Sequence, residues 1–528
     1  MMELYSLAFV LFLLAALFAY YLVGRVSEKY QWIVLLIVSL AYYCINGVDN
    51  ILFIVCTAFL TWGSGICFAK INGQYQITQN GFTGDKEARK KLKAFYQKKK
   101  RIILIITLLI TFGILGYLKY WNEIIGMFQI RSLVPFKSHL LLPLGISFYT
   151  FQSIGYVIDT YNGKYKPETN FARFLLFVSF FPQLIQGPIN RFDAMAKQLY
   201  MAHHMDYEKC RHALLIIGFG IIKKYAIADS LSGTIAKIFD HTDPNVPGSM
   251  VVFGILLYSV QQYTDFSGGI DMVLGVAELF GIHMAPNFRQ PYFSVSLADF
   301  WRRWHITLGQ WMRDYVFYPF ALTAPMQSIG KWAGKHLGKH LGRTIPACIA
   351  NLLVFLIVGL WHGAESHNIL WGLYNGIVIV VSDLMSPGFD FLTVKLRIRP
   401  ESKAFYLFRI VRTFIIVNIG WYFDRIKEFH YCMICFRNTI MNFEAGRFGE
   451  VLASYQLDYT KKPYMIAAIG CLLVFIVSVL KEKNIDVENC ILTMHPLKRS
   501  ALYVAAALLV LWAFVFTAPS GGFMYAVF

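Results

Sequence analysis

The chain has 528 residues, of which 57% are hydrophobic and 15% charged, and its formal net charge is +18. Because soluble globular chains carry about 25% charged residues, this composition argues against a soluble protein. The positive charge does not indicate nucleic-acid binding, since much of the basic surplus lies between apolar runs, where the cytoplasmic loops of membrane proteins carry Lys and Arg.

Apolar runs of about the length that spans a bilayer recur along most of the chain. Backbone polar groups in lipid must pair internally, so the runs are predicted to be helices, with the short or broken ones re-entrant or half-buried. The first run lacks the basic region and cleavage site of a secretory signal and is expected to be retained. The runs predict an all-α polytopic membrane protein, a single domain over residues 1–528, with roughly eleven to thirteen membrane-embedded helices. They lie near residues 5–24, 31–46, 50–69, 102–120, 139–159, 171–187, 212–233, 249–271, 347–362, 368–385, 405–423, 463–480 and 500–517.

Basic residues between the runs predict the orientation of the chain. The stretch Lys86–Arg101 is rich in Lys and Arg, is interpreted as a loop after the third run, and is expected in the cytoplasm. Three crossings back from this loop, the amino terminus lies outside. A second basic loop is also expected in the cytoplasm, which places the carboxyl terminus on or near the outer face of the plasma membrane. This loop contains Lys481, Lys483, Lys498 and Arg499.

Residues 286–345 contain no convincing spanning run and are expected to form a mixed cytoplasmic or interfacial helical region. Within them, the stretch Asp299–Phe320 carries aromatic and apolar residues at helical spacing. The pattern predicts an amphipathic helix at a membrane interface, and a generic interfacial anchor fits it equally well. The apolar stripe comprises Trp301, Trp304, Leu308, Trp311 and Tyr315, while Arg302, Arg303, Gln310 and Arg313 lie away from it.

Two histidines are candidates for proton transfer. His362 ends the apolar run Ile349–Trp361, and ionisable groups in membrane segments are costly and therefore functional candidates. Its imidazole can accept and return a proton near neutral pH, and the glycines beside it would let another backbone or a thin substrate approach. A hydrogen-bonded structural role is equally compatible with its position. His305, in the predicted amphipathic helix, is the second candidate.

Other polar residues have weaker patterns. Asp265 and Asp271 frame the segment YTDFSGGID and could orient a histidine, bind a cation or cap a broken helix, with a structural role favoured. Arginines near His305 could hold a phosphate through their bidentate forks, or could face solvent or lipid headgroups. No metal site is expected, because Cys432 and Cys435 form a lone CxxC without a second pair.

Five longer segments follow one another along the chain: LPLGISFYTFQSIGYVIDTY (Leu142–Tyr161), FFPQLIQGPINR (Phe180–Arg191), YTDFSGGID (Tyr263–Asp271), NFRQPYFSVSLADFWRRWHITLGQWMRDYVFYPF (Asn287–Phe320) and GLWHGAESHNILWGLYNG (Gly359–Gly376). In this order they resemble the membrane-bound O-acyltransferase (MBOAT) family, and more narrowly its bacterial alginate and peptidoglycan O-acetyltransferase branch. The resemblance is strong over roughly residues 1–425 and loose beyond them. Several long motifs in the right order are more specific than any single histidine.

The resemblance implies a ring of roughly 11–13 tilted or re-entrant helices around a membrane-embedded chamber. It implies that His362 is the essential catalytic histidine and His305 the second motif histidine. It also implies a cytoplasmic acyl donor, acetyl-CoA or another thioester, whose acyl group crosses through the chamber. His362 would deprotonate the hydroxyl that attacks the thioester. Donor binding is assigned to Arg302, Arg303, Trp304 and Asp265.

The carboxyl-terminal residues 519–528 end in FMYAVF. This stretch resembles an aromatic tail of the branch that acylates envelope polymers, which in the teichoic-acid D-alanylation system sits on a separate small membrane peptide. The resemblance implies that Tyr525 receives the acyl group near His362 and passes it outward. A phenol has a pKa near 10, so its attack at neutral pH needs a base such as His362. The alternative is an ordinary aromatic residue of the membrane interface.

The favoured function is therefore an O-acyltransferase that moves an acyl group, acetyl first, towards a cell-envelope or exported polysaccharide. The resemblance also implies an extracytoplasmic hydrolase-like acyltransferase as the partner that completes the transfer. D-alanyl transfer to teichoic acid is the runner-up, and the fused tail and the chain length argue against it. A transporter should show paired halves with matching broken helices, and none is found. A scaffold without chemistry is disfavoured by the presence of both His305 and His362.

Overall fold

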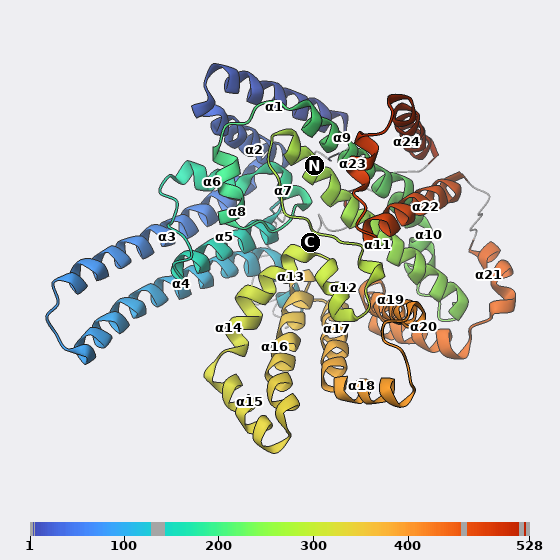
Figure 1. Ribbon diagram of the computed structural model, residues 1–528. Coiled ribbons are helices and arrows are strands. Elements are labelled where there is room, and N and C mark those ends of the chain that lie inside the picture. Colours follow the sequence, from blue (N-terminus) through green and yellow to red (C-terminus); the bar gives the residue numbers. More distant parts are fainter. Residues whose placement is uncertain (1–3, 5, 128–142, 456–461, 517–521, 524–528) are drawn as a thin grey trace. The chain divides into compact units, whose positions relative to one another are not determined.

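The computed structural model describes residue 4 and residues 6–127, 143–455, 462–516 and 522–523. Within these ranges every regular element is a helix, and the one isolated β-bridge joins Phe288 to Trp304 (Figure 1). The predicted all-α class is thus confirmed. The chain divides into two compact units, Met1–Ala213 with Val273–Ala285, and Leu214–Met272 with Pro286–Phe528. The single membrane domain over 1–528 stays a prediction beside this division.

The first unit is built from helices, several of them long and apolar. Its buried aromatic side chains, such as Tyr42 and Phe181, pack with ring centroids 5.6 Å apart. The helices are α1 (Leu7–Val26), α2 (Gln31–Gly47), α3 (Ile51–Asn80), α4 (Lys86–Met127), α5 (Ile146–Tyr161), α6 (Phe171–Ser179), α7 (Phe181–Gln186), α8 (Phe192–Tyr200) and the first half of α9 (Tyr207–Ile221), whose residues from Leu214 onward belong to the second unit.

The predicted loop over Lys86–Arg101 is wrong, because these residues form the first turns of α4. Their cytoplasmic location stays a prediction. Lys, Arg, Leu and Ala favour helix, and Lys91 adds an ion pair with Glu87 one turn earlier at 3.3 Å. With 42 residues, α4 is about 60 Å long at 1.5 Å per residue. The basic residues therefore form the first part of α4, ahead of its apolar part. They lie beside the polar end of α3 (Figure 1).

The second unit holds the residues that the sequence singled out. Its elements are the π-helix η4 (Ile222–Asp229), α10 (Ser230–Phe239), most of α11 (Gly248–Leu279), η5 (Pro291–Phe293), α12 (Leu297–Arg303), α13 (Ile306–Met312), the π-helix η6 (Arg313–Phe317), α14 (Tyr318–Ala321), α15 (Ala324–His336), α16 (Lys339–His362), α17 (Ser366–Leu384), α18 (Ser386–Lys395), α19 (Lys403–Arg425), α20 (Phe429–Met441), α21 (Phe448–Ser454), α22 (Lys462–Glu482), α23 (Val487–Leu492) and α24 (Pro496–Phe516).

In the part of the chain that the structure describes, eight helices are long and apolar enough to cross a membrane. A ninth span is formed if α17 and α18, bent by 56°, count as one. These helices match most of the predicted runs. The runs near 139–159, 171–187, 212–233 and 249–271 also become helices, but they are not among the eight, and their embedding in the membrane stays a prediction.

The predicted continuous amphipathic helix over Asp299–Phe320 is wrong. The chain breaks at Trp304 and His305, between α12 and α13, and becomes π-helical at Arg313. The break arises because His305 adopts a left-handed backbone with φ 47°, which ends one helix and starts the next in a new direction. The apolar stripe is still largely buried, with Trp304, Leu308 and Trp311 in the core.

Candidate active site

The turn at His305 is held by Asn287. The side-chain oxygen of Asn287 accepts hydrogen bonds from the backbone N–H of Thr307 at 3.0 Å and from its hydroxyl at 2.9 Å. His305 Nδ1 lies 3.3 Å from the same oxygen. Because a carbonyl oxygen can only accept, Nδ1 of the neutral imidazole carries the proton and Nε2 carries the lone pair. The turn therefore fixes the tautomer of His305.

His305 is buried, with 3% of its surface exposed. It lies between α12 and α13, outside the membrane-spanning helices, and burial lowers its pKa to about 3. At neutral pH His305 is thus an uncharged imidazole, packed edge-on against Phe266 with ring centroids 5.0 Å apart.

His362 is the last residue of α16, and the close packing of α16 on α17 positions it. A Cβ at Gly372 would lie 2.4 Å from the backbone oxygen of Phe355, and one at Gly359 would lie 2.6 Å from that of Asn368. The two helices can approach this closely only because both positions are glycine. The approach sets the His362 ring against Trp371 with centroids 5.0 Å apart. The expectation that a glycine beside His362 admits a second backbone is confirmed at Gly359.

The two histidines meet at one tryptophan. The Trp361 ring lies 6.1 Å from the ring of His305 and 4.9 Å from that of His362, centroid to centroid. His362 is buried like His305, with 7% of its surface exposed. Two buried histidines that are 57 positions apart in the sequence therefore contact the same tryptophan ring. A neutral imidazole with a fixed tautomer and a second buried imidazole, both against the Trp361 ring, are groups suited to proton transfer.

The residues assigned to donor binding have different surroundings in the structure. Trp304 is 1% exposed and packs among rings, with centroids 5.1 Å from Phe288, 5.3 Å from Phe300 and 5.6 Å from Trp421. This places Trp304 in the aromatic core behind His305. Its role in donor binding stays a prediction.

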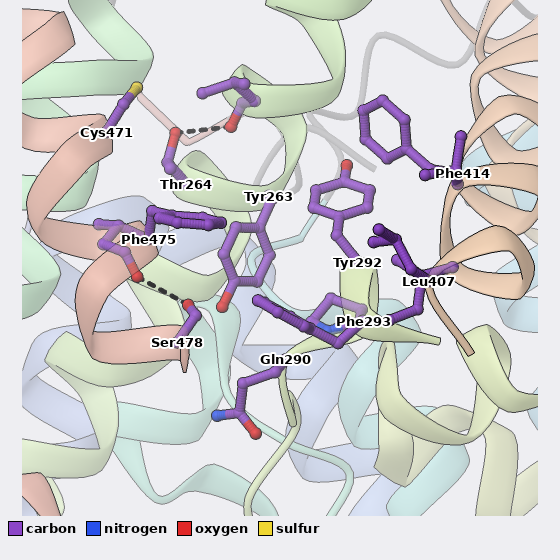
Figure 2. A pocket seen from close by; sticks show the side chains of 15 residues that line it. Tyr263, Thr264, Gln290, Tyr292, Phe293, Leu407, Phe414, Cys471, Phe475 and Ser478 are labelled. Atoms are coloured by element: carbon purple, nitrogen blue, oxygen red, sulfur yellow. Dashed lines mark hydrogen bonds between the residues drawn. The ribbon is translucent and has the colours of Figure 1, made fainter. Parts of the chain in front are cut away.

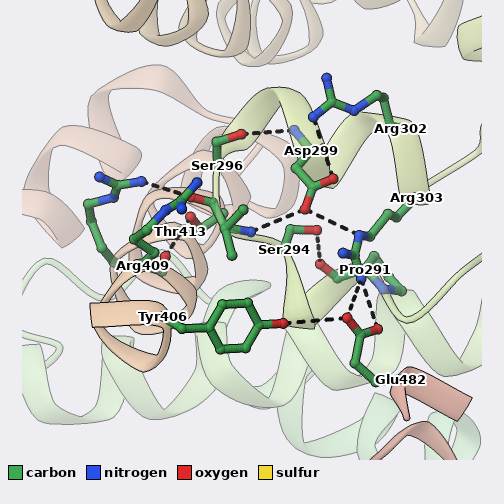
Figure 3. A network of polar contacts seen from close by, with 12 residues as sticks. Pro291, Ser294, Ser296, Asp299, Arg302, Arg303, Tyr406, Arg409, Thr413 and Glu482 are labelled. Atoms are coloured by element: carbon green, nitrogen blue, oxygen red, sulfur yellow. Dashed lines mark hydrogen bonds and ion pairs between the residues drawn. The ribbon is translucent and has the colours of Figure 1, made fainter. Parts of the chain in front are cut away.

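The two arginines differ in what they contact (Figure 3). Arg303 is paired with Asp299 at 3.2 Å and with Glu482 at 2.9 Å, so two carboxylates offset its charge. The side chain of Arg302 is 70% exposed and reaches Asp299 only at 3.5 Å. Of the two, Arg302 is the better placed to hold a phosphate, because Arg303 is already engaged.

Asp265 belongs to a buried ion cluster that the sequence analysis missed. The ammonium of Lys224 lies 2.6 Å from Asp265 and 3.0 Å from Asp229, and all three side chains are at most 2% exposed. Lys223 pairs with Asp271 at 2.7 Å. Two adjacent lysines inside an apolar run were the available signal, because charges there are costly unless paired.

An apolar cavity of about 510 Å³ lies among α11, η5, α19 and α22 (Figure 2). Tyr263 and Tyr292 line it, and their ring centroids lie 6.2 Å and 6.3 Å from that of Trp304. Neither histidine lines the cavity, but Trp304, which contacts two of its lining residues, directly precedes His305 in the sequence.

Two expectations concern other parts of the chain. Tyr525 lies outside the described residues. Among the described residues, no group of three or more His, Cys, Asp and Glu side chains is arranged to hold a metal ion. Cys432 and Cys435 are buried free thiols on α20.

The comparisons with known proteins agree on one protein family. The family model of MBOAT, the membrane-bound O-acyltransferase family, matches residues 168–423. The probable alginate O-acetylase AlgI of Pseudomonas aeruginosa is 31% identical over 79% of this chain and 71% of its own length. The corresponding protein of Pseudomonas syringae is 34% identical over 62% of this chain and 58% of its own length. The peptidoglycan O-acetyltransferase of Helicobacter pylori is 32% identical over 62% of this chain and 63% of its own length.

Proposed function

Since the chain belongs to the membrane-bound O-acyltransferase family, we propose that it transfers an acyl group, acetyl first, from a cytoplasmic thioester towards a cell-envelope or exported polysaccharide. The observation that carries the proposal is the meeting of His305 and His362 at Trp361, inside the matched residues 168–423. The names of the relatives support an acetyl group and a polysaccharide acceptor.

The proposed chemistry assigns the base to His362. Its imidazole takes the proton of the attacking hydroxyl, whose oxygen bonds to the thioester carbonyl carbon. The carbon–sulfur bond then breaks, and the proton passes from His362 to the departing thiolate. The products are an ester and a free thiol. His305, neutral and with its Nε2 lone pair fixed by Asn287, would accept a hydrogen bond in the same site.

The attacking hydroxyl in this proposal is that of Tyr525, which forms an aryl ester and releases the acyl group to an outer acceptor. An aryl ester is a reactive carrier, because a phenol with a pKa near 10 is a better leaving group than a sugar hydroxyl. An extracytoplasmic hydrolase-like acyltransferase would complete the transfer to the polymer. The exposed guanidinium of Arg302 is the group that we assign to the donor phosphates, and both chain termini are proposed to lie outside.

The proposal is tested with radiolabelled acetyl-CoA and purified protein in liposomes. Wild type should release labelled acetate or acetylated product, and His362→Ala should lower the rate by a factor of about 10² to 10⁴, the usual contribution of a general base. His340→Gln is the matched control, because His340 is an exposed histidine on the same helix. Equal loss in both variants would contradict the role of His362. A wild type that is inert with acetyl-CoA but active with a carrier-bound thioester would favour D-alanyl or another acyl group.

A further inference from the structure

The last residues that the structure describes, Gly522 and Phe523, lie against the buried ammonium of Lys224. The backbone oxygen of Gly522 accepts a hydrogen bond from Lys224 Nζ at 3.2 Å. The centroid of the Phe523 ring lies 5.0 Å from the same Nζ, within the range of a cation–π interaction. Phe523 is itself buried, with 3% of its surface exposed.

Lys224 has as many acceptors as it has donors. An ammonium group carries three N–H donors, and three oxygens surround this one, from Asp265 at 2.6 Å, Asp229 at 3.0 Å and Gly522 at 3.2 Å. The two carboxylates belong to the helices of the same unit. The third acceptor that the described residues provide belongs to the carboxyl-terminal segment, so displacement of that segment takes one acceptor away from the buried ammonium.

The π-helix η4 creates this arrangement. A π-helix links residues five positions apart, and Lys224 and Asp229 have that separation, so their side chains meet on one face of η4. Short π-helical segments inside helices are frequent at functional sites. Asp265 reaches the same ammonium from α11.

We propose that Lys224, held by Asp265 and Asp229, is the anchor that fixes the carboxyl-terminal segment and thereby positions the tail that carries Tyr525. Tyr525 follows Phe523 by two residues. The anchor rests on the contacts of Gly522 and Phe523, whereas its consequence for acyl transfer rests on the proposed relay through Tyr525. Lys224 is thus a positioning residue and does not touch the reacting atoms.

The neighbouring lysine provides a matched control. Lys223 lies in the same π-helix, its side chain is 6% exposed, and it pairs with Asp271. Its ammonium lies over the rings of Phe219 and Tyr263, which belong to α9 and α11 and not to the tail. Lys223→Met therefore removes a buried charge next to the anchor, with a comparable risk to the fold.

The test measures how tightly the tail is held, without any acyl donor. Full-length protein in detergent is treated with a carboxypeptidase, and the loss of residues 522–523 is followed by mass spectrometry. When opening is fast, cleavage follows the population of the open tail. The lost hydrogen bond of a buried charged donor corresponds to a change of roughly 5- to 150-fold in that population. Lys224→Met should therefore speed cleavage within this range. Phe523→Ala, which removes the cation–π contact, should speed it about fivefold. Lys223→Met, which does not contact the tail, should stay within about twofold of wild type.

The outcomes separate the anchor from the relay. Cleavage of Lys224→Met and Phe523→Ala at the wild-type rate overturns the anchor, as does an equal acceleration in Lys223→Met. If Lys224→Met does not fold, Phe523→Ala, which leaves the ion cluster intact, decides alone. An accelerated Lys224→Met that still acylates at the wild-type rate upholds the anchor and refutes its consequence for acyl transfer, whereas the relay itself is tested by Tyr525→Phe. Tyr525→Phe should keep the wild-type cleavage rate while losing acyl transfer.

Discussion

At the scale of single residues, His305 combines a left-handed backbone with full burial. A residue other than glycine in this conformation costs about 1–3 kcal/mol and persists only where its surroundings enforce it. Here the surroundings are the three contacts of the Asn287 side-chain oxygen and the hydrogen bond from the Ile306 N–H to the Asn287 backbone oxygen at 3.0 Å. Strain held at a functional position indicates that the orientation of the imidazole matters.

The burial of His305 predicts a pH dependence of stability. Its folded pKa of about 3 lies below the unfolded value of about 6.5, so the unfolded chain binds the extra proton and the folded protein loses stability as the pH falls below 6.5. Between pH 7 and pH 5 the loss is about 2 kcal/mol. His305→Gln removes the group that causes this loss of stability, so the melting temperature of the variant should fall less than that of wild type between pH 7 and pH 5. Exposed His336 provides the control His336→Gln, and equal falls in His305→Gln and wild type would contradict a buried neutral imidazole.

At the scale of elements, the glycine contact between α16 and α17 holds His362 against Trp371. A Cβ at Gly372 would lie 2.4 Å from the Phe355 carbonyl oxygen and 3.1 Å from the Gly359 Cα. A backbone shift within one helix alone does not relieve this clash. The helices must separate to admit the Cβ, and the separation moves the imidazole away from Trp371.

Gly372→Ala should therefore lower both stability and activity. Overpacking of a tight contact costs about 1–3 kcal/mol, and a displaced base slows the reaction further. Thermal unfolding in detergent and the acetyl-CoA assay measure the two effects. Gly388→Ala is the control, since a Cβ there meets nothing within 4 Å and alanine favours the helix. A Gly372→Ala variant as stable and active as Gly388→Ala would show that the close approach is not needed.

At the scale of the whole molecule, the sequence was most informative where apolar length decides the structure. The long runs became helices, because lipid leaves the backbone no other partner. The break at His305 was missed because helical spacing continues through it, and only the tertiary contacts of Asn287 impose the turn. The basic start of α4 is not predicted, because a charged stretch between two apolar runs is typical of a loop. The Lys, Arg, Leu and Ala residues of this stretch nevertheless favour helix.

The candidate site, like the fold, could be predicted from the sequence only in part. His305 and His362 could be singled out from their positions in the sequence, whereas their meeting at Trp361 depends on packing between helices far apart in the chain. The Lys224 cluster was missed because two lysines in an apolar run leave open which carboxylates pair with them. Only the fold brings Asp265, Asp229 and Gly522 to one ammonium.

The most direct test of the account is a search for the acyl group on the carboxyl-terminal peptide. Wild type, His362→Ala and Tyr525→Phe in liposomes are exposed briefly to acetyl-CoA, quenched in acid and analysed by peptide mass spectrometry. The account predicts one acetyl group on Tyr525 in wild type and none on this peptide in either variant. Rapid consumption of acetyl-CoA by Tyr525→Phe, with no acetyl group on the wild-type peptide, would contradict it and would indicate direct transfer from the thioester to the final acceptor.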